Sequence, residues 1–234
     1  MAGLELEDVV PLHLAEITFP NTHPLSGQTG QVFGFAICHL QGVILFETGI
    51  GTGNDVIDTA YQVVRRSLEA ELARREHRVD EVRAIVNSHL HFDHCGNNAM
   101  FPGVPIYVHT TERKAALQPG YTVLEWVSFP GAEYREITTE TTIAEHVKVI
   151  STPGHTIGHQ SVVVETNAGP VVLAGQAIYS KAEYDHIVTT GTVPPEDPAP
   201  DPGRYLASAQ RLIALRARRV YFSHDAQIWE QLPR

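Results

Sequence analysis

A run of ten residues between Asn87 and Gly96 limits the fold of this chain more than any other feature. The run holds three histidines and one aspartate within six positions, in the order His89-x-His91-x-Asp93-His94. Imidazole nitrogens and carboxylate oxygens are ligands that zinc and similar first-row metals accept. Four such side chains so close together indicate a metal site, and a chance polar loop is the disfavoured alternative.

The residues that flank this run predict where the site lies in the fold. Residues 83–86 read Arg-Ala-Ile-Val, a short and partly β-branched apolar segment that is typical of a buried strand. Gly96 ends the run, and a glycine marks a turn or a close approach of the backbone. The ligand-type residues therefore follow the end of a strand, where sites gather in sheets that are flanked by helices.

Apolar patterns predict strands and helices along the rest of the chain. We expect further strands at 11–19, 32–40, 43–46, 104–109, 147–150, 161–165, 170–174 and 219–222. We expect helices at 55–76, 111–117 and 202–217. A glycine-rich loop at 47–53 lacks the spacing of phosphate-binding loops, and a proline-rich surface loop is expected at 193–203. A group of predicted strands is followed by a predicted helix, and this order then occurs a second time along the chain. The pattern predicts an α/β fold of two sheets backed by helices.

Length and charge restrict the class of protein. A chain of 234 residues can bury one large core, and we expect a single domain over residues 1–234. The net charge of −10 argues against nucleic acid and anionic membranes, which bind basic surfaces. No secretion signal or transmembrane-length apolar run is visible. We therefore expect a cytoplasmic protein with a small-molecule substrate, and the oligomeric state stays unknown.

The two cysteines and His109 also need an interpretation, and for Cys95 and His109 two interpretations stay open. Cys38 and Cys95 form no CxxC pair, so we expect free thiols. Cys95 lies beside the ligand-type residues, and a small buried side chain is favoured over a metal ligand. His109 ends a predicted strand, and a place in the site and an uninvolved surface position are about equally favoured.

Two further histidines stand at the ends of predicted strands. His155 follows the strand at 147–150 in Pro-Gly-His, and His224 follows the strand at 219–222. With these histidines, the HxHxDH motif resembles that of the metallo-β-lactamase superfamily, and the resemblance covers essentially the whole chain. Within the superfamily, the chain most resembles the N-acyl homoserine lactonases, in the segments 88–97, 101–107, 125–130 and 152–160.

This resemblance implies an αβ/βα four-layer sandwich, in which two mixed sheets are flanked by helices and a metal site lies at one edge. It assigns one metal ion to His89, His91 and His155, and a second ion to Asp93, His94 and His224. It further implies a zinc-dependent hydrolase that opens a lactone or related ester by attack of a metal-bound hydroxide.

Tyr179 corresponds by resemblance to a lactonase tyrosine that contacts the substrate carbonyl oxygen, so its hydroxyl would stabilise the oxyanion. A packed tyrosine with a satisfied hydroxyl is about equally favoured. His159 is expected to support its loop, and Asp225 to orient a metal ligand. Phe92, Trp126 and Phe129 are weaker candidates for the pocket.

The chain departs from the family at two positions. Gln176 stands where the family joins the two metals through an aspartate, and Glu47 stands where aspartate is usual. A glutamine side chain is neutral and has one acceptor oxygen, so it bridges two cations poorly. We therefore expect one firmly bound zinc at the three histidines and a second, uncertain ion. Without the second ion, Asp93 would act as a general base or orient the water.

Gln176 also favours an alternative function. In it, the fold has been recruited to a different hydrolytic, lyase or isomerase step in specialised metabolism, with an altered or mononuclear metal site. A third class is a binding protein that has lost catalysis, and the intact set of three histidines argues against it.

Overall fold

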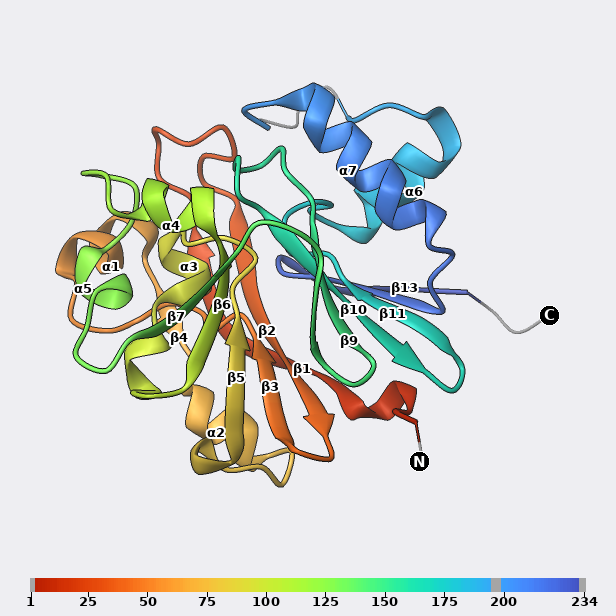
Figure 1. Ribbon diagram of the computed structural model, residues 1–234. Helices are drawn as coiled ribbons and strands as arrows, with labels where there is room; N and C mark the ends of the chain where they lie inside the picture. Colours follow the sequence, from red (N-terminus) through yellow and green to blue (C-terminus); the bar gives the residue numbers. More distant parts are fainter. Residues whose placement is uncertain (1–2, 195–198, 232–234) are drawn as a thin grey trace.

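Two β-sheets face each other in the computed structural model, which describes residues 3–194 and 199–231, and helices cover their outer faces (Figure 1). The first sheet has the strand order β4-β1-β2-β3-β5-β6-β7, and the second has the order β13-β12-β11-β10-β9-β8. Both sheets are mixed, because β3, β5, β6 and β7 run parallel, as do β11 and β12, while the other pairs are antiparallel.

The bounds of the elements follow in chain order. The first sheet and its surroundings comprise the 3₁₀ helix η1 (Leu6–Asp8), β1 (Val9–Thr18), β2 (Thr29–His39), β3 (Gly42–Phe46), α1 (Asp55–Tyr61), β4 (Val64–Arg65), α2 (Leu68–Ala73), η2 (Val79–Glu81), β5 (Val82–Val86), α3 (Phe92–Cys95), η3 (Asn98–Met100), β6 (Pro105–His109), α4 (Thr110–Ala116), α5 (Leu124–Val127) and β7 (Glu133–Ile137). The second comprises β8 (Thr141–Ala144), β9 (Val147–Ser151), β10 (Gln160–Thr166), β11 (Gly169–Leu173), α6 (Lys181–Thr190), α7 (Pro202–Ala214), β12 (Arg219–Phe222) and β13 (Asp225–Glu230).

The sheets pack through a shared apolar core. Phe35 and Phe46 of the first sheet are buried in one cluster with Val162, Leu173 and Tyr221 of the second. Burying a large apolar side chain contributes about 1.5–3 kcal/mol, so this layer stabilises the pairing of the sheets. The outer face of the first sheet packs on α2, and that of the second packs on α6 and α7. The predicted αβ/βα sandwich is confirmed.

The prediction of a single helix at 55–76 is wrong, because the structure has two short helices there, separated by a strand. Gln62 ends α1 in the left-handed conformation, with φ of 46°, and the chain then forms the short strand β4, which pairs with β1. The Arg65 side chain donates to the Gly51 carbonyl over 2.7 Å, and Ser67 caps a separate helix, α2. The periodicity at 57–68 was compatible with a helix, but pairing at the sheet edge outweighs that preference.

Most other predicted elements are confirmed within a few residues. Asp201 caps α7 as its sequence predicts, accepting a hydrogen bond from the Arg204 amide over 3.1 Å. The helix α6 and the strands β7, β8 and β13 were not predicted. Residues 195–198 of the expected surface loop lie outside the described residues.

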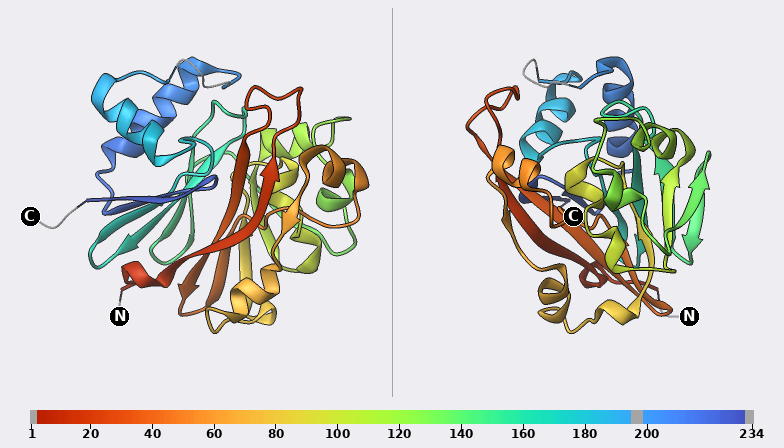
Figure 2. Two further views of the ribbon diagram at one scale, coloured as in Figure 1. Left: turned by 180° about the vertical axis from the view of Figure 1, so that it is seen from behind. Right: turned by 90° about the vertical axis from the view of Figure 1, so that its left-hand side faces the viewer.

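The helices α2 and α3 lie toward opposite ends of the first sheet, as both views in Figure 2 show. The loops that carry the candidate ligands are at the α3 end. Among the described residues, no helix has the length and apolar composition needed to span a bilayer.

Candidate metal centre

Three loops that follow strands meet at one edge of the two sheets. The first follows β5 and carries residues 87–95, the second follows β9 and carries His155, and the third follows β12 and carries His224. All six predicted ligands lie in two groups of three, and in each group the candidate ligand atoms lie within 4.8 Å of one another. We call His89, His91 and His155 the first triad, and Asp93, His94 and His224 the second triad.

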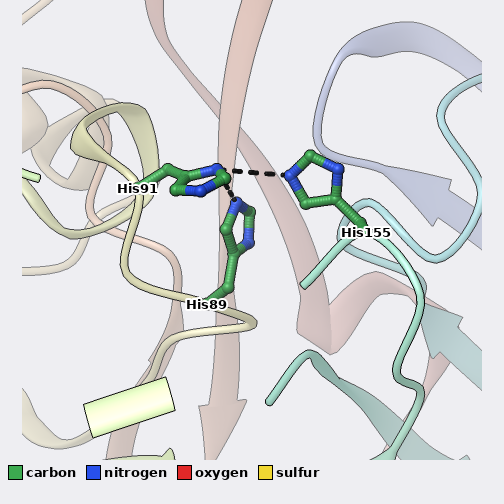
Figure 3. Close-up of side chains that lie close together, drawn as sticks. All are labelled: His89, His91 and His155. Carbon is green, nitrogen blue, oxygen red and sulfur yellow. Dashed lines mark hydrogen bonds between the residues drawn. The ribbon is translucent and has the colours of Figure 1, made fainter. Parts of the chain in front are cut away.

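The nitrogens of the first triad converge on one point (Figure 3). Nδ1 of His91 lies 3.0 Å from Nε2 of His89 and 3.3 Å from Nε2 of His155. Nitrogens of a tetrahedral zinc site lie about 3.3 Å apart, since each Zn–N bond is about 2.0–2.1 Å. Burial, reinforced by neighbouring imidazoles, holds the pKa of His89 and of His155 well below its ordinary value. Both rings are therefore neutral and keep the lone pair that a metal requires.

The second triad is built around the Asp93 carboxylate. Its Oδ2 lies 3.5 Å from Nε2 of His94 and 3.6 Å from Nε2 of His224. The His224 ring is held by a 2.7 Å hydrogen bond from Nδ1 to the Gln31 carbonyl, and its Nε2 is buried without a hydrogen-bond partner among the described residues. An unsatisfied buried nitrogen aimed at a carboxylate fits a metal ligand whose other nitrogen is anchored.

Glu47 binds the ring nitrogen of His94 that faces away from Asp93. Its buried carboxylate accepts a hydrogen bond from the Ser88 amide over 2.6 Å and one from Nδ1 of His94 over 2.8 Å. Burial lowers the pKa of His94, but the carboxylates of Asp93 and Glu47 outweigh burial and raise that pKa to about 9. The bond from Nδ1 leaves Nε2 of His94 to face Asp93.

A buried amide network, which sequence reasoning missed, fixes the loop after β5. The Asn87 side chain donates to the His94 carbonyl over 2.9 Å and accepts from Asn98 over 2.8 Å. Thr48 donates in turn to Asn98 over 2.8 Å. Gly96 is required at the end of this loop, because a Cβ there would lie 1.9 Å from the Gly51 nitrogen.

Gln176 follows β11 and lines one cavity together with residues of both triads. The backbone amide of Gln176 donates to Nε2 of His159 over 2.9 Å, and Nδ1 of His159 lies 2.9 Å from the Thr152 hydroxyl. His159 therefore supports the loop, as expected. Gly175 turns the chain here with φ of 62°, and a Cβ on it would lie 2.8 Å from the His159 ring.

A cavity of about 930 Å³ opens onto both triads. Its inner end is lined by His91, Asp93, His155, Gln176, Tyr179 and His224. Its apolar wall is lined by Ile17, Phe19, Leu25, Val56, Ile57, Tyr61, Phe92, Val123 and Leu124. No lysine or arginine is among the described residues that line it.

Comparison with known families agrees with this geometry. Residues 29–224 match the model of the metallo-β-lactamase superfamily. The chain belongs to this superfamily. The resemblance noted from the HxHxDH motif is thereby confirmed.

Several relatives within the metallo-β-lactamase superfamily are similar in sequence. N-acyl homoserine lactonase AiiA of Bacillus thuringiensis subsp. kurstaki is 34% identical over 160 residues, which are 67% of this chain and 61% of that protein. A probable metallo-hydrolase of Mycobacterium tuberculosis is 29% identical over 199 residues, covering 70% of this chain and 64% of that protein. The chain thus spans less than two thirds of the length of these relatives.

Solved structures in the superfamily share the fold. A variant of B. thuringiensis AiiA with N-decanoyl-L-homoserine bound at its active site has a TM-score of 0.74 at 24% identity, covering 97% of this chain and 95% of that one. An N-acyl homoserine lactone hydrolase with N-hexanoyl-L-homoserine bound at its catalytic metal centre has a TM-score of 0.71 at 26% identity, covering 93% and 92%.

The remaining predicted residues of this superfamily member have mixed outcomes. Asp225 accepts hydrogen bonds from the backbone amides of Lys181, at the start of α6, and of Gln227. Its two oxygens thus bind backbone amides, so the expectation that it orients a metal ligand is wrong. His109 caps α4 by accepting from the Thr111 amide over 3.2 Å. Cys95 is buried and donates to the His91 carbonyl over 3.2 Å, as the interpretation as a small buried residue requires.

Of the aromatic residues predicted to line the pocket, some do so and others pack in the core. Phe92 lines the cavity, whereas Trp126 and Phe129 pack in the apolar clusters. Tyr179 lines the cavity and stacks on His224, with ring centroids 4.9 Å apart. Its position is compatible with both interpretations of this tyrosine.

Proposed function

We propose that this chain is a metal-dependent hydrolase that opens the ring of N-acyl homoserine lactones or related esters. One observation carries the proposal: two complete triads of metal-ligand type stand at the inner end of a cavity whose other wall is apolar. The sequence similarity to N-acyl homoserine lactonase AiiA supports the same substrate class.

The cofactor in this proposal is zinc, held firmly by the first triad and more weakly by the second. The 3.0 and 3.3 Å spacing of the first triad nitrogens supports a tetrahedral ion there. Gln176 provides no charge between the two sites, so the second ion lacks one source of stabilisation. A bound zinc supplies Lewis acidity and lowers the pKa of a water ligand.

Two side chains have proposed catalytic roles. The Tyr179 hydroxyl, at the cavity wall beside His224, donates to the carbonyl oxygen as it gains negative charge. The Asp93 carboxylate binds the second ion when that ion is present. When it is absent, Asp93 accepts the proton of the attacking water.

The cavity supports a neutral substrate with an apolar tail. Its described lining lacks lysine and arginine, the side chains that recognise phosphate and other anions. Its apolar wall extends from the first triad toward α1 and the segment between β1 and β2. An N-acyl homoserine lactone is uncharged and carries a linear acyl chain, so it matches both properties.

Ring opening of the lactone tests this proposal directly, because each turnover releases one proton. Zinc-loaded protein is expected to release protons from N-hexanoyl and N-decanoyl homoserine lactone in a pH-stat. Chelator-treated protein and the variant His91→Ala are expected to be inactive. Absence of turnover by folded, zinc-loaded protein would rule out lactonase activity.

Gln176 supports a second candidate, in which the fold acts on a different ester or in a lyase or isomerase step. This residue lines the cavity at the position where a bridging carboxylate is expected. The variant Gln176→Asp separates the candidates. A large gain in lactonase activity in that variant would favour the second candidate, and little change or a loss would favour the first.

A further inference from the structure

Glu112 joins the two loops that carry the first triad. It lies in the first turn of α4, and its side chain is fully buried. Its Oε1 accepts a 2.9 Å hydrogen bond from the amide of Leu90, the residue between His89 and His91. Its Oε2 accepts a 2.7 Å hydrogen bond from the hydroxyl of Thr156, the residue after His155. One carboxylate thus fixes the distance between the two halves of the triad.

Further contacts restrain the same group. The Tyr121 hydroxyl donates to Oε1 of Glu112, and the Tyr121 ring lies against the His91 ring with centroids 5.0 Å apart. Gly158 brings the second loop directly onto α4, because a Cβ on Gly158 would lie 2.5 Å from the Glu112 amide nitrogen. Glu112 is therefore connected to all three histidines through neighbouring residues or contacts.

The carboxylate of Glu112 lies in no ion pair among the described residues. A buried carboxylate without a cation is costly, even when it accepts several hydrogen bonds. The first triad consists of three imidazoles and contributes no negative charge of its own. A divalent cation bound there would complement the charge of Glu112.

We propose that Glu112 is a positioning residue for a metal ion at the first triad. It holds the His89–His91 loop against the His155 loop, and it supplies negative charge that the three imidazoles lack. This inference rests on the proposed function in one respect, namely that the first triad binds a metal. It does not depend on the substrate.

A purely structural role would give a different result. If Glu112 only tied α4 to the loops, its loss would lower stability without a specific effect on metal affinity. Partners beyond the ligands typically change metal affinity by about 10- to 100-fold when they are removed. Metal affinity, measured on folded protein, therefore separates the two roles.

The decisive variant is Glu112→Gln, which keeps the size of the side chain and removes its charge. Affinity for cobalt is measured by chelator competition in a His224→Ala background, in which only the first triad is complete. We expect Glu112→Gln to bind cobalt about 10- to 100-fold more weakly, with altered visible absorption bands. Cobalt affinity within twofold of the background protein would overturn the inference.

Glu71 offers a matched control. It is a second buried glutamate, on α2, paired with Arg74 at the far end of the first sheet from α3 (Figure 1). Glu71→Gln is expected to leave cobalt affinity unchanged, and an equal loss in this control would also overturn the inference. If the background protein itself binds no cobalt, the proposed metal site fails instead.

Thr156 keeps the inference testable if Glu112→Gln does not fold. Thr156→Ser retains the hydroxyl that donates to Glu112, whereas Thr156→Val replaces it with a methyl group of similar size. We expect cobalt affinity to be retained in the serine variant and lowered several-fold in the valine variant. Equal affinities in the two variants would contradict the link between the loops.

Discussion

Nδ1 of His94 lies 2.8 Å from Oε2 of Glu47, and both side chains are fully buried. Glu47 adopts the left-handed conformation with φ of 68°, and its other oxygen accepts from the Ser88 amide over 2.6 Å. The departure from aspartate at this position therefore has a physical role. The longer side chain reaches both the end of β5 and a ligand of the second triad.

Replacing Glu47 by glutamine should lower the stability of the metal-free protein. Glutamine offers one acceptor oxygen and a donor NH₂, so either the Ser88 amide or Nδ1 of His94 loses its acceptor. An unsatisfied buried donor costs about 1–3 kcal/mol. Urea unfolding should show this loss for Glu47→Gln. Glu230→Gln, which alters the surface ion pairs of Glu230 with Arg218 and Arg219, should lose less than about 1 kcal/mol. Equal losses in the two variants would argue against this role for Glu47.

His159 should make the metal-free protein sensitive to acid. Burial is the main cause that lowers the pKa of His159 from 6.5 to about 3. As the pH falls below about 6.5, the unfolded imidazole takes up a proton and the folded one does not, so stability decreases. The contribution of this residue between pH 7 and pH 5 is about 2 kcal/mol.

The comparison with His159→Gln isolates this contribution. Urea unfolding at pH 7 and pH 5 should show a smaller loss of stability in the variant, by about 2 kcal/mol. Other histidines titrate in both proteins and cancel in the difference. Parallel pH profiles for the two proteins would show that His159 does not stay neutral.

The sequence predicted the six candidate ligands because each follows the end of a strand. His89, His91, Asp93 and His94 are close in sequence, and His155 and His224 follow apolar runs that are easily recognised. Glycines mark the turns. Local signals of this kind do not depend on the rest of the fold.

Glu112 and the buried network of Asn87, Asn98 and Thr48 were missed because they carry no local signal. Glu112 looks like an ordinary helix residue, and only the folded chain brings its carboxylate to Leu90 and Thr156. The break in the helix expected at 55–76 has the same origin, since β4 exists through its pairing with β1. Contacts between distant segments decide both features.

Gln176 should limit the protein to one tightly held metal ion. After dialysis against a weak chelator, elemental analysis of the wild type should give about one zinc per chain. Gln176→Asp should retain close to two, because the added carboxylate offsets charge between the triads. Gln176→Asn, which adds no charge, serves as the control and should resemble the wild type. Two equivalents in the wild type would show that Gln176 does not weaken the second site.

The apolar wall of the cavity should select for acyl chain length. Each buried methylene contributes up to about 0.8 kcal/mol, so kcat/KM should be higher for N-decanoyl than for N-hexanoyl homoserine lactone. Ile57→Trp fills this wall and should remove the preference. Ile228→Trp, on β13 and outside the cavity lining, should keep it. An unchanged preference in Ile57→Trp would place the acyl chain elsewhere.

Tyr179→Phe tests the oxyanion role of the hydroxyl without removing the ring. The phenylalanine ring can still stack on His224, and the backbone amide at 179 can still donate to Glu183, a 2.6 Å hydrogen bond in this structure. Loss of one oxyanion donor typically lowers kcat by about 100- to 1000-fold. We therefore expect a large decrease in kcat, with zinc content and KM changed little. If kcat stays within a few-fold of the wild type, Tyr179 is a packed tyrosine and the metal ion alone stabilises the developing charge.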